Sequence, residues 1–398
     1  MKKFLSVLLS LTLVMSLFAC GNTSQPSQTA ASEAAAETQA ASEASTFKVG
    51  GIGPITGGAA VYGQAVKNAI QIAIDEINAN GGFNGYQVEY LFADDEHDAE
   101  KSVNAYNSLK DWGMQMLIGT VTSSPCISVA DKTYADNMFQ ITPSGSAVDC
   151  VTNPNVFRMC FSDPNQGIAS AQYINDHSLA KKVGVIYDSS DVYSTGIYEK
   201  FIQESAGKNY EVVAEEQFTA DTKTDFNTQL AKLKAADADL VFLPFYYSEA
   251  ALVLNQAKQM GYAPTFFGCD GMDGILTLEN FDTSLAEGLM LLTPFSADAT
   301  DSLTRNFVSE YQKRHNEIPN QFAADGYDCA YTLKLAIEQA NLTPNHSISE
   351  ICEAIKSAIT KINQKGLTGD SISWEANGEP NKTPKAVIIQ NGVYVSAD

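Results

Sequence analysis

The amino-acid sequence predicts an α/β protein built from two doubly wound, Rossmann-like lobes. Short apolar runs alternate with longer amphipathic segments from Phe47 onward, which is the pattern of parallel strands covered by helices on both faces. This alternation restarts near Lys182, which indicates two similar blocks in series. The folded body of roughly 350 residues is also too long for one ordinary hydrophobic core, and this length favours two lobes.

The first block begins with a strand and a strongly periodic helix. Val66, Ile70 and Ile77 fall on one helical face, and Gly81-Gly82 ends the helix. The same reading along the block predicts strands at residues 47–52, 88–92, 116–119 and 138–141, with helices at 61–78, 98–111 and 125–136.

The second block repeats this rhythm and continues into a longer C-terminal part. We expect strands at residues 182–187, 211–218, 240–245 and 265–268, with helices at 165–176, 193–207, 223–235 and 248–260. Residues 288–294 are expected to form a strand that returns to the first lobe, ahead of helices at 302–314 and 322–340. The final strands, at 386–390 and 393–395, are assigned to the second lobe.

This order of elements predicts that the chain crosses between the lobes three times, so that a three-strand hinge joins them. The N-terminal lobe is predicted to comprise residues 47–163 and 294–370. The C-terminal lobe is predicted to comprise residues 164–293 and 371–398. Two such lobes would leave a crevice between the ends of their sheets.

The first twenty residues have the form of an export signal. Two lysines precede an apolar run from Phe4 to Phe18, which is shorter than the ~20 apolar residues of a membrane-spanning helix. The segment Leu17-Phe18-Ala19-Cys20 resembles the bacterial lipobox. We therefore expect residues 1–19 to be a cleaved signal peptide and Cys20 to be lipidated; an ordinary secreted protein is the alternative.

Residues 20–46 are predicted to be a disordered tether behind the lipidated cysteine. They are almost entirely Ser, Ala, Thr, Gln and Glu, and they contain no large apolar side chain that could be buried. Such a segment would hold the folded body at the outer face of the cell membrane, with the lipid as its membrane contact. The predicted location is therefore extracytoplasmic and lipid-anchored.

The net charge and the scattered cysteines and histidines exclude several classes of function. A formal charge of −22 repels phosphates and anionic headgroups, so nucleic acid is not an expected partner. No Cys or His group has the spacing of a metal site, and neither a complete dinucleotide loop nor a GxSxG elbow is present. We expect no cofactor and no metal. Cys150 and Cys160 could form a local disulfide or remain buried thiols.

Two strands of the first block end in hydroxyl-bearing segments. The strand at 116–119 continues into Thr122-Ser123-Ser124-Pro125, and the next strand continues into Thr142-Pro143-Ser144-Gly145-Ser146. Proline is favoured at the first helical position, so Pro125 is expected there. The preceding serines and free backbone N–H groups could hold a carboxylate at the positive end of the helix. A plain helix cap is the alternative.

The second block offers groups of the opposite character. Asp270 follows the strand at 265–268, and Tyr246 and Tyr193 follow two other strands of the block. A carboxylate among tyrosines suits an ammonium group. A ligand that carries both charges would bridge the lobes, and because buried charges are costly unless paired, closure should favour a zwitterion.

These segments resemble the type I periplasmic binding proteins of branched-chain amino-acid uptake. The resemblance runs in order along the body through the segments Gly53-Pro54-Ile55-Thr56-Gly57, Tyr62-Gly63, Gly81-Gly82, Asp94-Asp95, Ile118-Gly119, Ser123-Ser124, Ile141-Thr142-Pro143-Ser144, Phe267-Gly268, Gly271, Phe322 and Gly326-Tyr327-Asp328. The family implies an extracytoplasmic receptor, not an enzyme, that closes on an amino acid and delivers it to the permease subunits of an ABC importer. It also implies a monomer.

The resemblance assigns a role to each site residue. Ser123 corresponds to the serine that holds the ligand carboxylate, Ser144 to a residue whose carbonyl meets the amine, and Ser146 to one that touches both ends. Asp270 corresponds to the acid that pairs with the α-ammonium. Tyr193 and Tyr246 correspond to crevice tyrosines, and Tyr62 to the side-chain wall.

Two departures from the family leave the choice of ligand side chain open. His97 and Thr122 stand where the family has a disulfide, and the wall that includes Phe245 and Tyr247 is more polar or aromatic than an aliphatic pocket needs. A related amide or small carboxylate is therefore an alternative ligand. A receptor that presents its ligand to a sensor or chemoreceptor is an alternative function, and a secreted enzyme is a third possibility.

Overall fold

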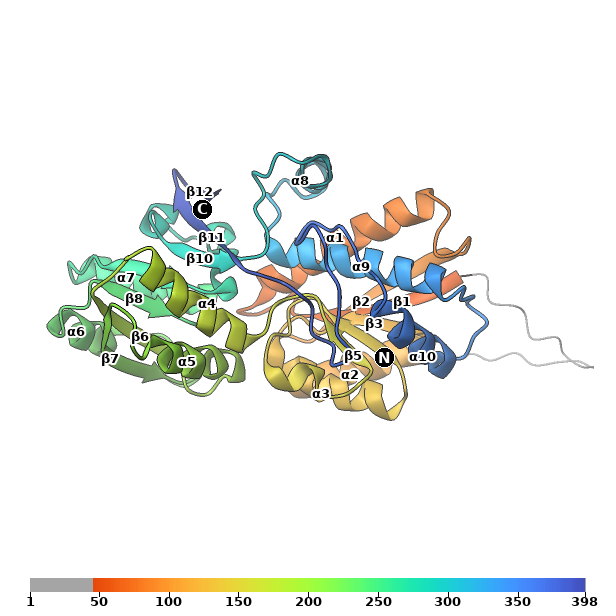
Figure 1. Cartoon of the computed structure of the whole chain (residues 1–398), viewed down its shortest axis with the longest axis horizontal. Helices are drawn as coiled ribbons and strands as arrows, with labels where there is room; N and C mark the ends of the chain where they lie inside the picture. Colours follow the sequence, from red (N-terminus) through yellow and green to blue (C-terminus); the bar gives the residue numbers. More distant parts are fainter. Residues whose placement is uncertain (1–45, 398) are drawn as a thin grey trace, which may run out of the picture. The chain divides into compact units, whose positions relative to one another are not determined.

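The structure, a computed structural model, describes residues 46–397 (Figure 1). The predicted signal peptide, Cys20 and almost all of the predicted tether lie outside the described residues. The described chain forms two sheets, one of five strands and one of seven. We call the five-stranded sheet with its helices the first lobe, and the seven-stranded sheet with its helices the second lobe. Two mainly parallel sheets interleaved with helices confirm the predicted α/β fold class.

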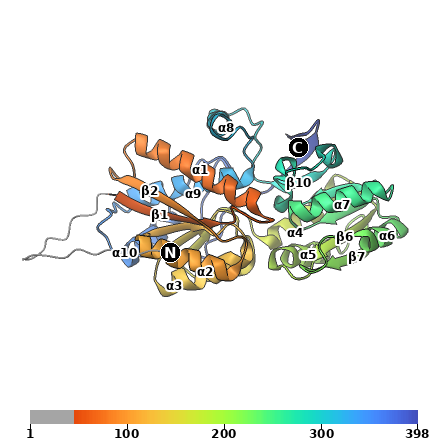
Figure 2. The ribbon, with the colours of Figure 1, turned by 180° about the vertical axis from the view of Figure 1, so that it is seen from behind.

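The sheet of the first lobe is parallel throughout, in the order β2-β1-β3-β4-β5. Its strands are β1 (Thr46–Gly53), β2 (Gln87–Asp94), β3 (Met116–Gly119), β4 (Phe139–Thr142) and β5 (Val156–Arg158). Helices α1 (Ala60–Ala79) and α9 (Gln321–Gln339) pack on each other, and α2 (Ala99–Trp112) packs on α3 (Ser123–Ala135) (Figure 2). Every residue of β3 and β4 is buried, as expected for strands covered on both faces.

The sheet of the second lobe has the order β12-β11-β10-β9-β8-β6-β7. Its strands are β6 (Lys182–Asp188), β7 (Glu211–Phe218), β8 (Leu240–Leu243), β9 (Thr265–Gly268), β10 (Met290–Thr293), β11 (Lys385–Gln390) and β12 (Val393–Ser396). The last two strands are antiparallel to their neighbours, and the others are parallel. Helix α4 (Asp163–Asp176) precedes β6, and the helices between the first four strands are α5 (Val192–Ser205), α6 (Asn227–Ala235) and α7 (Tyr247–Gln259).

The expectation that residues 288–294 return to the first lobe is wrong. Strand β10 lies inside the seven-stranded sheet, where Met290 pairs with Phe267 of β9 and Ile388 of β11. Its four residues are all buried, and the strand has a neighbouring strand on each side within the sheet. The chain leaves this sheet only after β10 and continues into α8 (Ser302–His315), which contacts α1.

The sequence reading also missed two elements. Strand β5 has only three residues and ends at Arg158, a charged residue that a buried strand does not favour. Helix α10 (Ile348–Ile359) packs on α9 and begins with a capping box in which Ser347 and Glu350 bond reciprocally. Its isoleucines recur at helical spacing, so both signals were present in the sequence.

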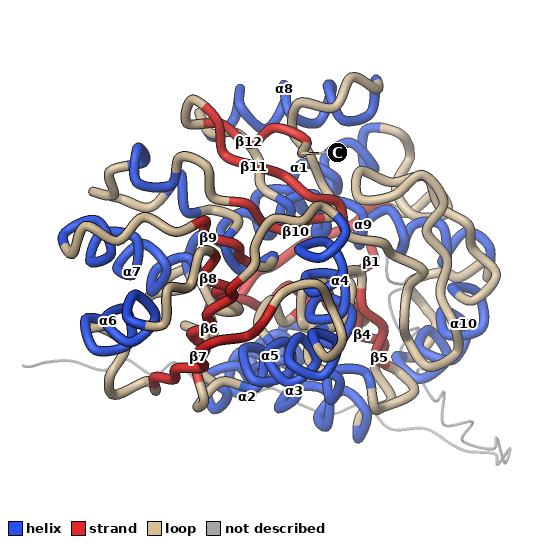
Figure 3. Tube along the Cα trace, turned by 60° about the vertical axis from the view of Figure 1, so that its left-hand side comes forward, coloured by secondary structure: helices blue, strands red, loops and turns tan. Residues whose placement is uncertain are grey.

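The three segments that join the sheets follow β5, β10 and α10 (Figure 3). The last of them is fastened to α9 by an ion pair in which Lys382 Nζ lies 2.6 Å from Asp325 Oδ1. Both side chains are almost fully buried, so removal of either one would leave an uncompensated charge. None of the helices within residues 46–397 combines the length and the apolar character that a membrane-spanning helix requires.

Candidate ligand-binding site

Ser123 is positioned by the end of β3 and the start of α3. The helix begins at Ser123, so Pro125 is its third residue. The prediction that Pro125 occupies the first helical position is therefore wrong. The Ser123 hydroxyl oxygen accepts the backbone N–H groups of Ser146 at 3.2 Å and Ala147 at 3.1 Å. It therefore ties two loops of the first lobe together, and its own proton remains to donate to a ligand.

The N-terminus of α3 has no side-chain cap. Thr122 occupies the N-cap position with extended backbone, and its side chain accepts no hydrogen bond from the first turn. The backbone N–H groups at this helix end are thus available to an anion, and the helix dipole favours negative charge there. The cap-only interpretation of the two serines is therefore not supported by the geometry.

The loop after β4 holds the two other predicted serines. The Ser144 hydroxyl donates to the carbonyl of Val121 at 2.5 Å, which joins this loop to the one before α3. The Ser146 hydroxyl is buried near the Asp163 carboxylate, and neither group makes a hydrogen bond of normal geometry within the described residues. Burial raises the pKa of Asp163 well above its ordinary value, and the nearby Ser146 hydroxyl opposes this shift.

Arg158 holds the backbone of this loop, and this residue was not predicted from the sequence. Its guanidinium is fully buried and donates to the carbonyls of Gly145 at 3.2 Å, Ser146, and Ala147 at 3.0 Å. Its charge is paired with Glu379 Oε1 at 3.2 Å. The only sequence signal was an arginine directly after the apolar pair Val156-Phe157. Arg158 is thus a positioning residue for the backbone that carries Ser144 and Ser146.

Asp270 follows β9 and lies in the wall of the second lobe. Tyr193 donates its hydroxyl to Asp270 Oδ1 at 2.6 Å and accepts the N–H of Gly271 at 2.9 Å. Burial raises the pKa of Asp270 to about 6, and the hydrogen bond from Tyr193 opposes that shift. No Lys, Arg or His side chain among residues 46–397 forms an ion pair with Asp270. This carboxylate is therefore a buried charge that lacks a cation.

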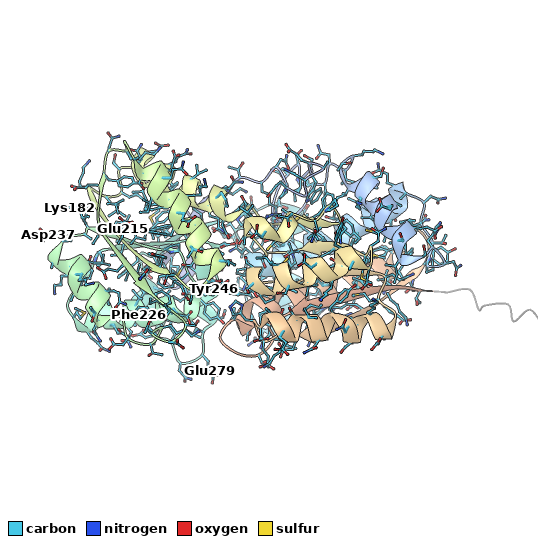
Figure 4. The ribbon with its side chains drawn as sticks, turned by 90° about the horizontal axis from the view of Figure 1, so that it is seen from below. Lys182, Glu215, Phe226, Asp237, Tyr246 and Glu279 are labelled. Atoms are coloured by element: carbon cyan, nitrogen blue, oxygen red, sulfur yellow. The ribbon has the colours of Figure 1, made fainter. Side chains whose placement is uncertain are left out.

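Aromatic rings from both lobes meet around Asp270. Tyr62 of α1 donates its hydroxyl to the carbonyl of Gly271, and its ring lies 4.2 Å from that of Phe322 and 5.6 Å from that of Tyr246. Tyr246 stacks on Tyr193 with ring centroids 4.9 Å apart. Figure 4 shows Tyr246 at the end of the second lobe that faces the first. The two lobes are therefore in direct contact across these rings.

Six of the seven predicted ligand residues line one small cavity between the lobes, and Ser146 is not among its lining residues. The lining residues are Tyr62, Val121, Thr122, Ser123, Ser144, Tyr193, Tyr246, Asp270, Gly271 and Phe322. The cavity has a volume of about 10 Å³, which is room for about one water molecule. An amino acid therefore requires the lobes or the aromatic rings to move apart.

A second cavity, of about 330 Å³, shares Tyr246 with the first and carries many charged groups. Its acidic lining residues include Glu96, Asp188, Asp191 and Glu249, and Lys223 forms an ion pair with Glu249 at 3.0 Å. Burial raises the pKa of Asp191 to about 6. A side chain that extends beyond Tyr246 thus meets a polar environment.

His97 and Thr122 form a contact at the boundary between these cavities. His97 Nδ1 lies 2.9 Å from Thr122 Oγ1, and the imidazole meets the Tyr246 ring edge-on at 5.5 Å. Burial, and then the charge of Lys223, lower the pKa of His97, so the ring is neutral at pH 7. The two residues are hydrogen-bonded at the place where the family resemblance implied a disulfide.

The cysteines and possible metal ligands add no chemistry to this site. Cys150 and Cys160 are buried free thiols, which is the second of the two alternatives that the sequence left open. Within residues 46–397, no group of three or more His, Cys, Asp or Glu side chains could hold a metal ion. What the site offers is a hydroxyl and a helix N-terminus on one lobe and an unpaired carboxylate on the other.

Comparison with known proteins gives matches along nearly the whole described chain. Residues 46–390 match the family model described as "periplasmic binding protein". The Leu/Ile/Val-binding protein BraC3 of Rhizobium johnstonii is 28% identical over 343 residues, which cover 82% of this chain and 91% of that protein.

Two solved structures are similar in sequence as well as in fold. The substrate-binding protein LivJ of the branched-chain amino acid transporter of Streptococcus pneumoniae, in complex with isoleucine, has a TM-score of 0.80 and 27% identity. The leucine-binding protein LivK of Thermotoga maritima has a TM-score of 0.77 and 26% identity. Each match covers 88% of this chain and 98% of the other.

Proposed function

Because the chain belongs to the periplasmic binding protein family, we propose that it is an extracytoplasmic solute-binding lipoprotein of an ABC importer. Its ligand is an amino acid, branched-chain or similar, that is held between the two lobes and delivered to the permease. The observation that carries this proposal is the pairing of opposite recognition groups across one cavity. Ser123 and the start of α3 lie on one side, and the unpaired Asp270 carboxylate lies on the other.

The ammonium end of the ligand is assigned to the second lobe. Asp270 already accepts the Tyr193 hydroxyl at Oδ1, so an ammonium would supply the missing positive charge. A buried carboxylate without a cation is costly, and an ammonium hydrogen-bonded to it relieves that cost. A ligand that lacks the ammonium would leave the cost in place.

The carboxylate end is assigned to the first lobe. The Ser123 hydroxyl proton is free because its oxygen accepts two backbone N–H groups, and the uncapped start of α3 offers further donors. Several partial donors share this task, so loss of one hydroxyl should cost less than loss of the Asp270 charge.

The names of the similar proteins support an amino acid as ligand. BraC3 is described as binding Leu, Ile and Val, and LivJ was solved with isoleucine. The polar cavity beyond Tyr246 and the His97–Thr122 contact are the features that would adjust the choice of side chain. Substrates with aliphatic and with polar side chains therefore both belong in the ligand screen.

Isothermal titration calorimetry on the purified mature protein tests the binding proposal. We expect stoichiometric binding of at least one amino acid from a panel of the common amino acids and their amides. A ligand at 100 times its Kd should add about 2.7 kcal/mol to the free energy of unfolding. Asp270→Ala should abolish this binding, whereas Asp221→Asn, an exposed acid of the same lobe, should not change it. Unchanged affinity in Asp270→Ala would refute the assignment.

The anchoring and transport parts of the proposal rest on the N-terminal sequence and need a separate test. Cys20→Ala should release the protein from the membrane fraction and stop the incorporation of labelled fatty acid. Cells that lack the gene should lose uptake of the amino acid that calorimetry identifies. Membrane retention of the Cys20→Ala protein would contradict the lipid anchor without affecting the binding proposal.

A further inference from the structure

The charged cavity beyond Tyr246 adjoins the proposed amino-acid site in two places. Tyr246 lines both cavities, and of the consecutive residues Ser123 and Ser124, the first lines the small cavity and the second lines the charged one. The charged cavity has a volume of about 330 Å³, within the range of small-molecule sites. A ligand held at Ser123 and Asp270 therefore has this space beside it for a side chain. We call this space the acidic cavity.

The lining of the acidic cavity carries more negative than positive charge. Its acids and its one lysine are Glu96, Asp188, Asp191, Glu249 and Lys223. Lys223 is paired with Glu249 at 3.0 Å, and Glu96 is paired with Lys101 at 2.6 Å. Asp188 and Asp191 form no ion pair with any Lys, Arg or His side chain of residues 46–397. Because no acid cluster of the described residues could hold a metal ion, an organic cation is the group that would compensate these charges.

Asp191 is the acid best placed to meet a ligand. It occupies the N-cap position of α5, lines the cavity and remains partly exposed, so a group inside the cavity can reach its carboxylate. Burial raises the pKa of Asp191 to about 6, so the carboxyl is mainly ionised at pH 7. The Tyr246 hydroxyl and the Ser194 backbone N–H oppose this shift in pKa, but neither brings a positive charge. A cationic ligand group would offset the cost of burying this carboxylate.

The acidic cavity also has an apolar side. Phe218 and Phe245 line it, and their rings meet edge-on with centroids 5.0 Å apart. Ala59 and Ala220 belong to the same lining. Long cationic side chains place their methylene groups on apolar surface and their charged head among polar groups. This combination of an apolar wall and unpaired acids fits such a side chain, whereas a short aliphatic side chain would leave Asp191 without a cation.

We propose that the amino acid held between the lobes has a cationic side chain, as lysine, ornithine and arginine have. This proposal rests on the proposed function and names its substrate class. Ser123 and Asp270 hold the α-carboxylate and the α-ammonium. The methylene groups pack along Phe245, and the cationic head donates to Asp191. A side chain that ends in a carboxylate is repelled by the acids of the cavity, and the net charge of −22 attracts a ligand of net positive charge.

Calorimetry on the mature protein with L-lysine, L-ornithine, L-arginine and L-norleucine tests this substrate class. Norleucine has an aliphatic chain like that of lysine but lacks the terminal ammonium, so the comparison isolates the charge. We expect at least one of the cationic amino acids to bind about tenfold or more tightly than norleucine. Equal or tighter binding of norleucine or leucine would overturn this proposal and leave the proposed function intact. Absence of binding by every amino acid of the panel would refute the proposed function, and this proposal with it.

Asp191→Asn locates the cationic head. Asparagine is also favoured at an N-cap, so α5 should keep its start. The variant should bind the cationic amino acid about tenfold or more weakly and norleucine nearly as before. Asp237→Asn is the matched control, because it removes the same charge from an exposed position of the second lobe, away from Tyr246 (Figure 4). Equal losses in the two variants would overturn the placement of the cationic head at Asp191.

Lys223→Gln decides the matter if Asp191→Asn does not fold. The change leaves Glu249 without its cation, so the acidic cavity becomes more negative. The cationic amino acid should bind several-fold more tightly to this variant, whereas the affinity for norleucine should not rise. A damaged fold would not produce such a selective gain. Unchanged or weaker binding of the cationic amino acid would overturn the proposal.

Discussion

Acidification should weaken amino-acid binding through Asp270, because its carboxyl titrates near neutrality. Burial raises its pKa to about 6 in the unliganded protein, whereas an exposed aspartate titrates near 3.8. The ammonium of the ligand pairs only with the ionised form. Protonation of Asp270 therefore competes with the ligand, and the apparent Kd should rise as the pH falls through 6.

The magnitude follows from the fraction of Asp270 that is ionised. With a pKa of about 6, the carboxyl is about nine-tenths ionised at pH 7 and about one-tenth ionised at pH 5. The Kd should therefore rise roughly tenfold between these values, which corresponds to about 1.4 kcal/mol. Calorimetry in buffers of constant ionic strength measures this change, and it should also record proton release on binding near pH 6.

Asp270→Asn separates this effect from the other acids that titrate in the same range. The variant should bind weakly, with a Kd that changes little from pH 7 to pH 5. A wild-type Kd that is constant over this range would refute the view that an ionised Asp270 pairs with the ligand. An equally steep dependence in Asp270→Asn would assign the titration to another carboxyl, such as Asp191, whose pKa is also raised to about 6.

Three further predictions concern the first lobe and the unliganded fold. Ser123→Ala removes one donor to the ligand carboxylate and should raise the Kd by about tenfold in calorimetry, less than Asp270→Ala does. Arg158→Met leaves Glu379 and three carbonyls without their partner, so it should lower the free energy of unfolding, measured in urea, by about 3 kcal/mol. An unchanged free energy of unfolding would show that the guanidinium does not hold the loop. Without ligand, the protein should gain thermal stability from pH 7 to pH 5.5. Buried acids whose pKa is raised to about 6 bind more protons in the folded state than in the unfolded state, whereas the lowered pKa of His97 acts in the opposite direction. A fall in Tm over this range would contradict the prediction. These acids are Asp191, Asp270, Asp273 and Asp325.

Local patterns in the sequence were sufficient for most of the fold. Helix α1 was predictable because its apolar residues recur at helical spacing, and β3 and β4 because short apolar runs precede turn-forming residues. The expectation that residues 288–294 return to the first lobe was wrong because this apolar run fits either sheet equally well, although the predicted lobe bounds had kept residues 164–293 together. Only its pairing with β9 and β11 decides the matter, and such pairing is not visible in the run itself.

The site could be predicted in part for a related reason. Ser123, Ser144 and Asp270 each lie within four residues after the end of a strand, so the rule that ligands bind at the carboxyl ends of parallel strands was sufficient to select them as candidates. Arg158 was not found in this way because it ends β5, a three-residue strand that was not predicted, and because the carboxylate that pairs with it, Glu379, is more than two hundred residues away in the chain. Ser146 follows the same strand as Ser144 but is not among the lining residues of the cavity, which strand order alone does not show.

The turn at residues 270–271 is held by both lobes, and this arrangement connects ligand recognition with closure. From the second lobe, Tyr193 bonds the Asp270 carboxylate and the Gly271 N–H. From the first lobe, Gln321 donates to the carbonyl of Asp270 at 2.8 Å, and Tyr62 donates to the carbonyl of Gly271. The same short segment thus carries the charge that would meet the proposed ammonium and the carbonyls to which the first lobe donates. Because an unpaired Asp270 is costly once both lobes enclose it, the closed arrangement gains most from a ligand that brings the ammonium with it.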